Sequence, residues 1–169
     1  MEDPKTPVMV LLQENISVTK DDGVTPANVL VTAQWYKDQV MKGYDAMVTV
    51  GMINDTVDPS GQGYNTNPTG EDHVYIVEVN VWAIDKFDGT GKQIITDEVM
   101  RWKLVQQISE IIRANCVNPK FGSPPVASGI HTLRVRVFRD LDDPTAIPHP
   151  LRRSQFEIEA FFVKDSLAG

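Results

Sequence analysis

The chain has 169 residues, which suits one domain and is short for two. Hydrophobic residues make up 41% and charged residues 23%, and this globular balance excludes a disordered or collagen-like chain. The net charge of −7 disfavours a general nucleic-acid-binding protein, because such proteins are usually basic. The sequence has no apolar run of about 18 residues and no secretory pattern at its start, so we expect no membrane segment.

Residues 1–27 predict an N-terminal arm followed by a short element. Residues 1–7 are polar and contain two prolines, which indicates an arm. The apolar stretch from Val8 to Leu12 fits either a short helix or an edge strand. Asp21, Asp22 and Gly23 then form a turn signal.

Two strands are predicted next, over residues 29–36 and 46–53, because apolar residues alternate in both. One face of the first is expected to consist of Val29, Val31, Ala33 and Trp35. One face of the second consists of Ala46, Val48, Val50 and Met52. The intervening residues 37–44 have room for one helical turn.

Residues 54–72 have the composition of a long loop, with three glycines, two prolines and almost no apolar side chains. Loops of this length are uncommon in small domains and are usually functional or mobile. A passive surface loop and a functional interface loop are therefore both open.

The clearest strand is predicted over residues 73–84. Its first face is apolar and consists of Tyr75, Val77, Val79, Val81 and Ala83. The second face mixes apolar side chains with Glu78 and Asn80, which is typical of an antiparallel sheet covered on one side. A turn follows at residues 88–91. Its glycines resemble a phosphate-binding loop, but that motif needs Gly at position 86 and Ser or Thr at position 93. Lys86 and Gln93 occupy these positions, so the motif does not match.

Residues 96–115 predict the main helix. Thr96 is placed to cap its N-terminus, and Asp97 and Glu98 lie in the first turn, where the helix dipole favours anions. Apolar residues recur at helical spacing along one face. They are Met100, Leu104, Val105, Ile108, Ile111 and Ile112.

The C-terminal part predicts two more strands separated by loops at residues 121–129 and 140–150. In residues 131–139 we expect Leu133, Val135 and Val137 to point inward and Arg134 and Arg136 outward. The last strand, residues 153–163, alternates its apolar residues in the same way, and residues 164–169 form a tail. The whole chain thus predicts one α+β domain, a mostly antiparallel sheet of about five strands with one long helix packed on it.

No catalytic constellation is present in the sequence, so we expect no enzyme, no cofactor and no metal site. The three histidines are isolated, and Cys116 is expected to be a small buried hydrophobic residue. Two acidic groups keep other interpretations open. Asp85 with Asp88 is a possible acid–base pair for a small enzyme, and residues 140–143 are either a cation site or a solvated acidic loop.

Charge is unevenly distributed along the chain. Residues 1–85 contain four basic and 13 acidic side chains, a net charge of −9, whereas residues 86–169 contain 12 basic and ten acidic ones, a net charge of +2. Five arginines lie on or beside the last two strands, where they suit carboxylates of a neighbouring subunit or a DNA backbone. These are Arg134, Arg136, Arg139, Arg152 and Arg153. Ordinary solvated surface charge is the alternative.

Several segments together resemble a known family. They are the run Val74-Tyr-Ile-Val-Glu-Val-Asn-Val-Trp-Ala-Ile-Asp85 with the glycine turn after it, the helix Glu98-Val-Met-Arg-Trp-Lys-Leu-Val-Gln-Gln-Ile-Ser-Glu-Ile-Ile112, the strand Leu133-Arg-Val-Arg-Val-Phe-Arg139, the closing strand Leu151-Arg-Arg-Ser-Gln-Phe-Glu-Ile-Glu-Ala-Phe161 and the earlier Ala46-Met-Val-Thr-Val-Gly51. Over roughly residues 28–163 the chain resembles the tail terminator (tail completion) and neck proteins of tailed phages and archaeal tailed viruses.

This resemblance implies a non-enzymatic virion protein, assembled in the host cytoplasm, that forms a ring, often of six subunits. The ring ends polymerisation of the tail tube and joins it to the head connector, while viral DNA passes through the lumen without sequence-specific binding. An acidic lumen suits such passage. Another neck protein, a connector adaptor or stopper, is the alternative. Long loops of these families contact neighbouring rings, which makes Asp58, Tyr64, Asn65 and Asp72 interface candidates beside the five arginines.

Overall fold

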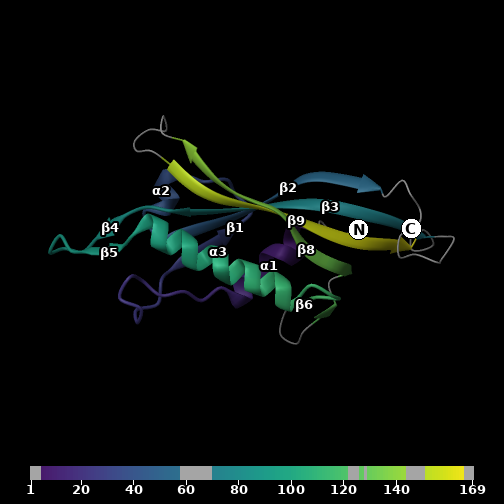
Figure 1. Cartoon of the computed structure of the whole chain (residues 1–169), viewed down its shortest axis with the longest axis horizontal. Coiled ribbons are helices and arrows are strands. Elements are labelled where there is room, and N and C mark those ends of the chain that lie inside the picture. Colours follow the sequence, from purple (N-terminus) through teal and green to yellow (C-terminus); the bar gives the residue numbers. More distant parts are fainter. Residues whose placement is uncertain (1–4, 58–69, 122–125, 128, 144–150, 166–169) are drawn as a thin grey trace.

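The computed structural model describes residues 5–57, 70–121, 126–127, 129–143 and 151–165 (Figure 1). One five-stranded sheet runs along the molecule in the order β1-β2-β3-β9-β8. The long helix α3 (Asp97–Ala114) and the N-terminal helix α1 (Lys5–Asn15) lie along one face of it (Figure 1). The short α2 (Asp38–Met41) packs on the other face, and the predicted α+β class is confirmed.

The sheet is mixed, because β1 (Val29–Thr32) runs parallel to β2 (Ala46–Val57). The other three pairings are antiparallel, joining β2 to β3 (Gly70–Ala83), β3 to β9 (Leu151–Asp165) and β9 to β8 (Ile130–Asp143). Two small sheets complete the fold. One consists of β4 (Lys86–Phe87) and β5 (Gln93–Ile95), the other of β6 (Lys120–Phe121) and β7 (Val126–Ala127).

The strands are longer than the hydrophobic pattern predicts. Residues 54–57 and 70–72 belong to β2 and β3, and residues 140–143 belong to β8, although all were expected in loops. β9 likewise reaches Asp165, which shortens the expected tail, whereas β1 ends at Thr32, four residues early. Ladder hydrogen bonds continue past the point where side chains stop alternating, because each backbone N–H and C=O needs a partner whatever its side chain.

The main core lies between the sheet and the two helices. The predicted inward residues of β3 and α3 are all buried there, as are Ala46, Val48 and Val50 of β2. Met52, predicted to share a face with Val50, and Trp35, predicted to share a face with Val31, are exposed. Trp35 instead packs edge-on against Trp82 on the opposite face, where Met41 of α2 covers a smaller apolar cluster. Among the described residues, no helix is long and apolar enough to span a membrane.

The N-terminal segment is a helix, which decides between the two predicted alternatives. α1 begins at Lys5, so part of the expected arm is helical, and Pro7 lies in the first turn, where a proline costs no helical hydrogen bond. Val8, Leu11 and Leu12 are buried at helical spacing against the main core.

The N-terminus of α3 is at the predicted residue but is capped differently. Thr96 has the extended backbone of an N-cap, yet its hydroxyl makes no capping bond and donates to Asp21 Oδ2 at 2.6 Å. The backbone N–H of Asp97 donates instead to Asp85 Oδ1 at 2.8 Å. A carboxylate from outside the helix thus satisfies one of the free N–H groups of the first turn.

A bulge in β8 overturns one predicted side-chain direction. Val135 pairs with Ile158 and Val137 pairs with Glu157, so Arg136 is the extra residue. Val137 therefore shares the face of Glu157, away from the main core, and the prediction that it points inward is wrong. Phe138, opposite the buried Phe156, takes the inward position.

Candidate functional site

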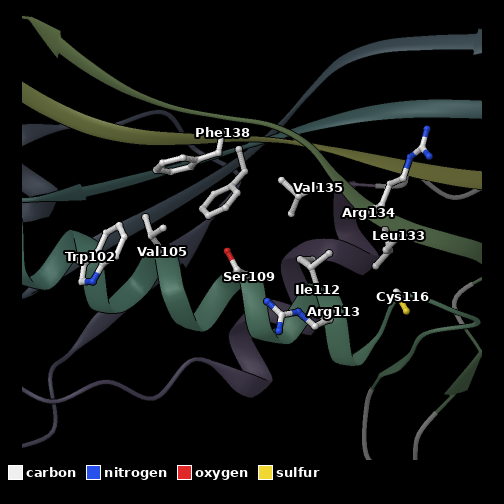
Figure 2. A pocket seen from close by; sticks show the side chains of 11 residues that line it. Trp102, Val105, Ser109, Ile112, Arg113, Cys116, Leu133, Arg134, Val135 and Phe138 are labelled. Atoms are coloured by element: carbon white, nitrogen blue, oxygen red, sulfur yellow. The ribbon is translucent and has the colours of Figure 1, made fainter.

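An apolar groove of about 530 Å³ lies between α3 and the edge strand β8 (Figure 2). The helix contributes one wall and β8 the other, the buried Phe156 of β9 also lines the groove, and the exposed Cys116 lies at its margin. The lining residues are Trp102, Val105, Ser109, Ile112, Arg113, Cys116, Leu133, Arg134, Val135, Phe138 and Phe156.

The rim of the groove exposes large apolar side chains to water. Trp102 is 58% exposed, Phe138 41% and Val135 37%, while Val105 and Leu133 are buried at its floor. In Figure 2 these side chains point into the space between helix and strand, and the Ser109 hydroxyl is directed there from the helix. A contiguous apolar surface of this kind is typical of a site that binds another protein segment or an apolar ligand.

The bulge at Arg136 is what builds the β8 wall of the groove. A regular strand would alternate from Val135 to Val137 on the helix side, and Phe138 would point away. The extra residue turns Phe138 toward α3, where its ring packs on Phe156 with centroids 5.1 Å apart. Sequence reasoning missed this wall, since no glycine or other local signal marks the bulge.

A second hollow of about 620 Å³ adjoins the groove at Trp102. Inside it the buried Arg101 donates from Nε to Asp97 Oδ1 at 2.6 Å and from Nη1 to Ser154 Oγ at 3.2 Å. Ser154 in turn donates to Asp140 Oδ1 at 2.6 Å, and Arg101 Nη1 lies 3.5 Å from the same atom. Burial raises the pKa of Asp97, and the hydrogen bond from Arg101 opposes that rise.

β8 and β9 pair with each other, and this pairing brings the five arginines to one edge of the sheet. They do not form one cluster, however. Glu159 lies 2.5 Å from Arg134 Nε and 3.8 Å from Arg136 Nε, and Glu157 accepts from Arg139 at 2.5 Å, all on the face away from α3. These guanidiniums already have partners within the chain.

The remaining two arginines diverge at the other end of β9. Arg153 stacks over the rings of Trp35 and Trp82, with its guanidinium carbon 5.1 and 5.4 Å from their centroids. Arg152 pairs with Asp142 at 3.7 Å on the α3 face, because their register continues that of Asp140 and Ser154. Arg153 thus helps to hold Trp35, whereas Arg152 stays on the surface.

Four of the predicted interface residues were expected in the long loop of residues 54–72. Asp58, Tyr64 and Asn65 lie outside the described residues. Asp72 lies in β3, where its backbone pairs with Val163, and not in a loop as predicted.

Among the carboxylates of the alternative enzyme and cation interpretations, those whose side chains the structure describes make hydrogen bonds or ion pairs within the chain. Asp85 accepts from the helix N-terminus, and Asp88 accepts from Thr90 and Lys92 in the β4–β5 turn, which confirms that turn. The Thr90 hydroxyl bond is the main cause that lowers the pKa of Asp88. In the described part of the chain, no three His, Cys, Asp or Glu side chains gather as metal ligands do.

The predicted burial of Cys116 is wrong. α3 ends at Ala114, and Cys116 lies on the segment that leaves the helix and is exposed at the margin of the groove (Figure 2). Its carbonyl accepts the N–H of Leu133 at 3.0 Å, which holds this segment beside β8.

No protein-family model matches this chain, and no curated protein sequence is significantly similar to it. The candidate site therefore depends on its geometry alone. Of the described surface, the α3–β8 groove has the strongest physical mark of binding, a concentration of exposed aromatic and aliphatic side chains on two rigid elements.

Proposed function

We propose that this chain is a structural subunit of a tailed virus. In this proposal its copies form a ring at the head-proximal end of the tail tube, end the polymerisation of that tube and join it to the head connector. The observation that carries the proposal is the α3–β8 groove, with its exposed Trp102, Val135 and Phe138.

The composition of the groove suits a protein partner. Large aromatic residues surrounded by arginine are the residue types that contribute most to protein–protein binding. Trp102 and Phe138 fit this description, and Arg113 flanks them from α3, whereas the Arg134 guanidinium points away from the groove toward Glu159. Leaving these rings in water is unfavourable for a monomer, so burying them in an assembly supplies a driving force of about 25 cal/mol per Å² of apolar surface.

The uneven charge supports the ring and its relation to DNA. The net charges of −9 for residues 1–85 and +2 for residues 86–169 favour contacts between unlike surfaces of neighbouring copies. Unlike surfaces that meet head to tail close into rings when the rotation allows. An overall charge of −7 also suits a channel through which DNA passes without being held.

The test is to locate the chain within virus particles. Antibodies raised against it, applied to purified particles of the virus whose genome encodes it, are expected to label the junction of head and tail in negative-stain images. Label at the head side of that junction would assign the chain to the connector adaptors or stoppers instead. Particles that lack the chain altogether would overturn the proposal, and a capsid protein from the same particles serves as the positive control.

A further inference from the structure

We propose that the α3–β8 groove of one copy receives the β4–β5 end of the next copy. The inference builds on the proposed ring, because it names the two surfaces that meet in it. We define the β4–β5 end as β4, β5 and the turn between them, together with the neighbouring loop of residues 20–25. Its two exposed apolar residues, Phe87 and Val24, are the groups that would enter the groove.

The β4–β5 end is an unusual place for apolar side chains. Phe87 is 60% exposed and Val24 is 80% exposed, among the most exposed large apolar residues of the described chain. The loop and the small sheet touch where Asp21 N–H donates to the carbonyl of Ile94 at 3.2 Å. The groove is an apolar hollow, and this end exposes apolar side chains that could be buried in it.

Hydrogen bonds within the β4–β5 end fix its shape before any contact. Asp88 Oδ1 accepts from the Thr90 N–H at 2.8 Å, the Thr90 hydroxyl at 2.6 Å and the Lys92 N–H at 3.0 Å. Asp22 Oδ1 accepts from the N–H groups of Val24 and Thr25, both at 2.9 Å. A projection ordered in advance loses little conformational entropy on binding.

The two surfaces differ in charge. The hollow at the β4–β5 end is lined by three carboxylates, those of Asp21, Asp22 and Asp88, against the two ammonium groups of Lys20 and Lys92, and Lys20 also lies 3.7 Å from Asp45. At the groove, Arg113 is exposed and has no ion-pair partner among the described residues. Such complementarity favours this pairing of surfaces over the contact of two grooves or of two acidic ends.

The two surfaces lie on different parts of the molecule, so a second copy is needed. In Figure 1, β4 and β5 extend beyond the N-terminal end of α3, whereas its C-terminal end, where Arg113 and Cys116 flank the groove, lies near β6. α3 has 18 residues and is about 27 Å long. Contacts between unlike surfaces repeat from copy to copy, which is the geometry of a ring and not of a symmetric pair.

The single cysteine of the chain offers a specific cross-linking test, because Cys116 lies at the groove. A second thiol is placed at the β4–β5 turn by Gly89→Cys, where a Cβ meets no atom within 4 Å. Under mild oxidation, purified G89C protein is expected to form a ladder of disulfide-linked multimers on a non-reducing gel. The ladder is expected because each copy then has one thiol at each of the two surfaces.

Three controls make the outcome decisive. Wild-type protein and G89C/C116S have one thiol each and can form no product larger than a dimer. Gly51→Cys is the matched control, since a Cβ also fits there without contact but on the sheet face away from the groove. If G89C cross-links no further than G51C over the same range of protein concentration, the proposed contact is overturned.

A second substitution tests the apolar part of the contact. Phe87→Ser in the G89C background is expected to slow cross-linking by about tenfold or more, because it removes the largest apolar side chain of the β4–β5 end. An unchanged rate would contradict a role for Phe87. The cross-linking and the antibody labelling of particles test different proposals. Disulfide-linked multimers without antibody label on particles would overturn the viral role alone. Antibody label on particles without disulfide-linked multimers would overturn this interface alone.

Discussion

At the scale of single residues, the most consequential side chain outside the apolar core is Arg101. It is buried by α3 and the sheet, and it joins Asp97 of the helix to Ser154 and Asp140 of two strands. The bulge in β8 places Asp140 in reach, because it shifts the face of every residue after Arg136. No pattern in the sequence predicted this ion pair.

We predict that Arg101→Met destabilises the fold by about 3 kcal/mol, since it leaves Asp97 and Asp140 without their cation. The loss is measured by urea unfolding, as a lower midpoint with an unchanged dependence of the unfolding free energy on urea concentration. Arg113→Met, on the same helix but exposed, is the control and is expected to cost less than about 1 kcal/mol. Equal losses for the two variants would contradict the structural role of Arg101.

Asp22 gives a prediction for the dependence of stability on pH. The hydrogen bond from the Thr25 hydroxyl, followed by those from the backbone N–H groups of Val24 and Thr25, lowers its pKa from 3.8 to about 2. The folded state therefore favours the carboxylate. Its contribution to stability is present above pH 3.8 and is lost as the pH falls toward about 2.

Asp22→Asn removes this titration and retains an oxygen that accepts from the same N–H groups. We expect the stability advantage of the wild type over the variant to shrink between about pH 5 and about pH 2.5. Urea midpoints at both pH values measure it, and all other carboxylates titrate in both proteins. A constant advantage would show that the Asp22 carboxylate has no such linkage.

At the scale of elements, the sequence predicted where the helix α3 begins, but the group that caps the helix differs from the predicted one. Thr96 begins the helix as predicted, but the first-turn N–H of Asp97 is satisfied by Asp85, and the Thr96 hydroxyl binds Asp21. Tertiary contacts from two loops replace the local cap.

We predict that Asp85→Ala costs about 1 kcal/mol, the usual loss for removing a cap. Thr96→Ala is expected to cost less than half of that, because it removes an exposed bond between two side chains. Thermal unfolding of the two variants gives the order of the losses. A larger effect at Thr96 would indicate that the helix is capped locally after all.

At the scale of the whole molecule, α1 and α3 cover one face of the sheet, and the groove runs where α3 meets the edge strand β8. The β4–β5 end and the groove differ in charge as well as in shape. Part of the free energy of their contact should therefore be electrostatic and screened by salt.

We predict that cross-linking of G89C slows as NaCl rises from about 0.05 M to about 0.5 M, because the Debye length falls about threefold and the attraction between the charges of the two surfaces is screened. The rate of disulfide formation at each salt concentration measures the effect. Reaction of the same thiols with a small neutral disulfide controls for their accessibility. A rate that rises with salt would indicate a contact that depends on apolar burial alone.

The hydrophobic pattern determined much of the secondary structure. Apolar residues at period two in β3 and at helical spacing in α3 predicted their buried faces residue by residue, because burial acts on each side chain through its own polarity. The predicted α+β class followed from the same pattern.

The tertiary structure alone decided the candidate site. The bulge at Arg136, the exposure of Cys116 and the partners of the five arginines all depend on which strands pair and in which register. Register and bulges arise from hydrogen bonds between distant backbone segments, and these bonds are nearly independent of side-chain identity. A local reading of the sequence therefore predicts what is buried, whereas the groove between α3 and β8 exists only once the sheet has formed.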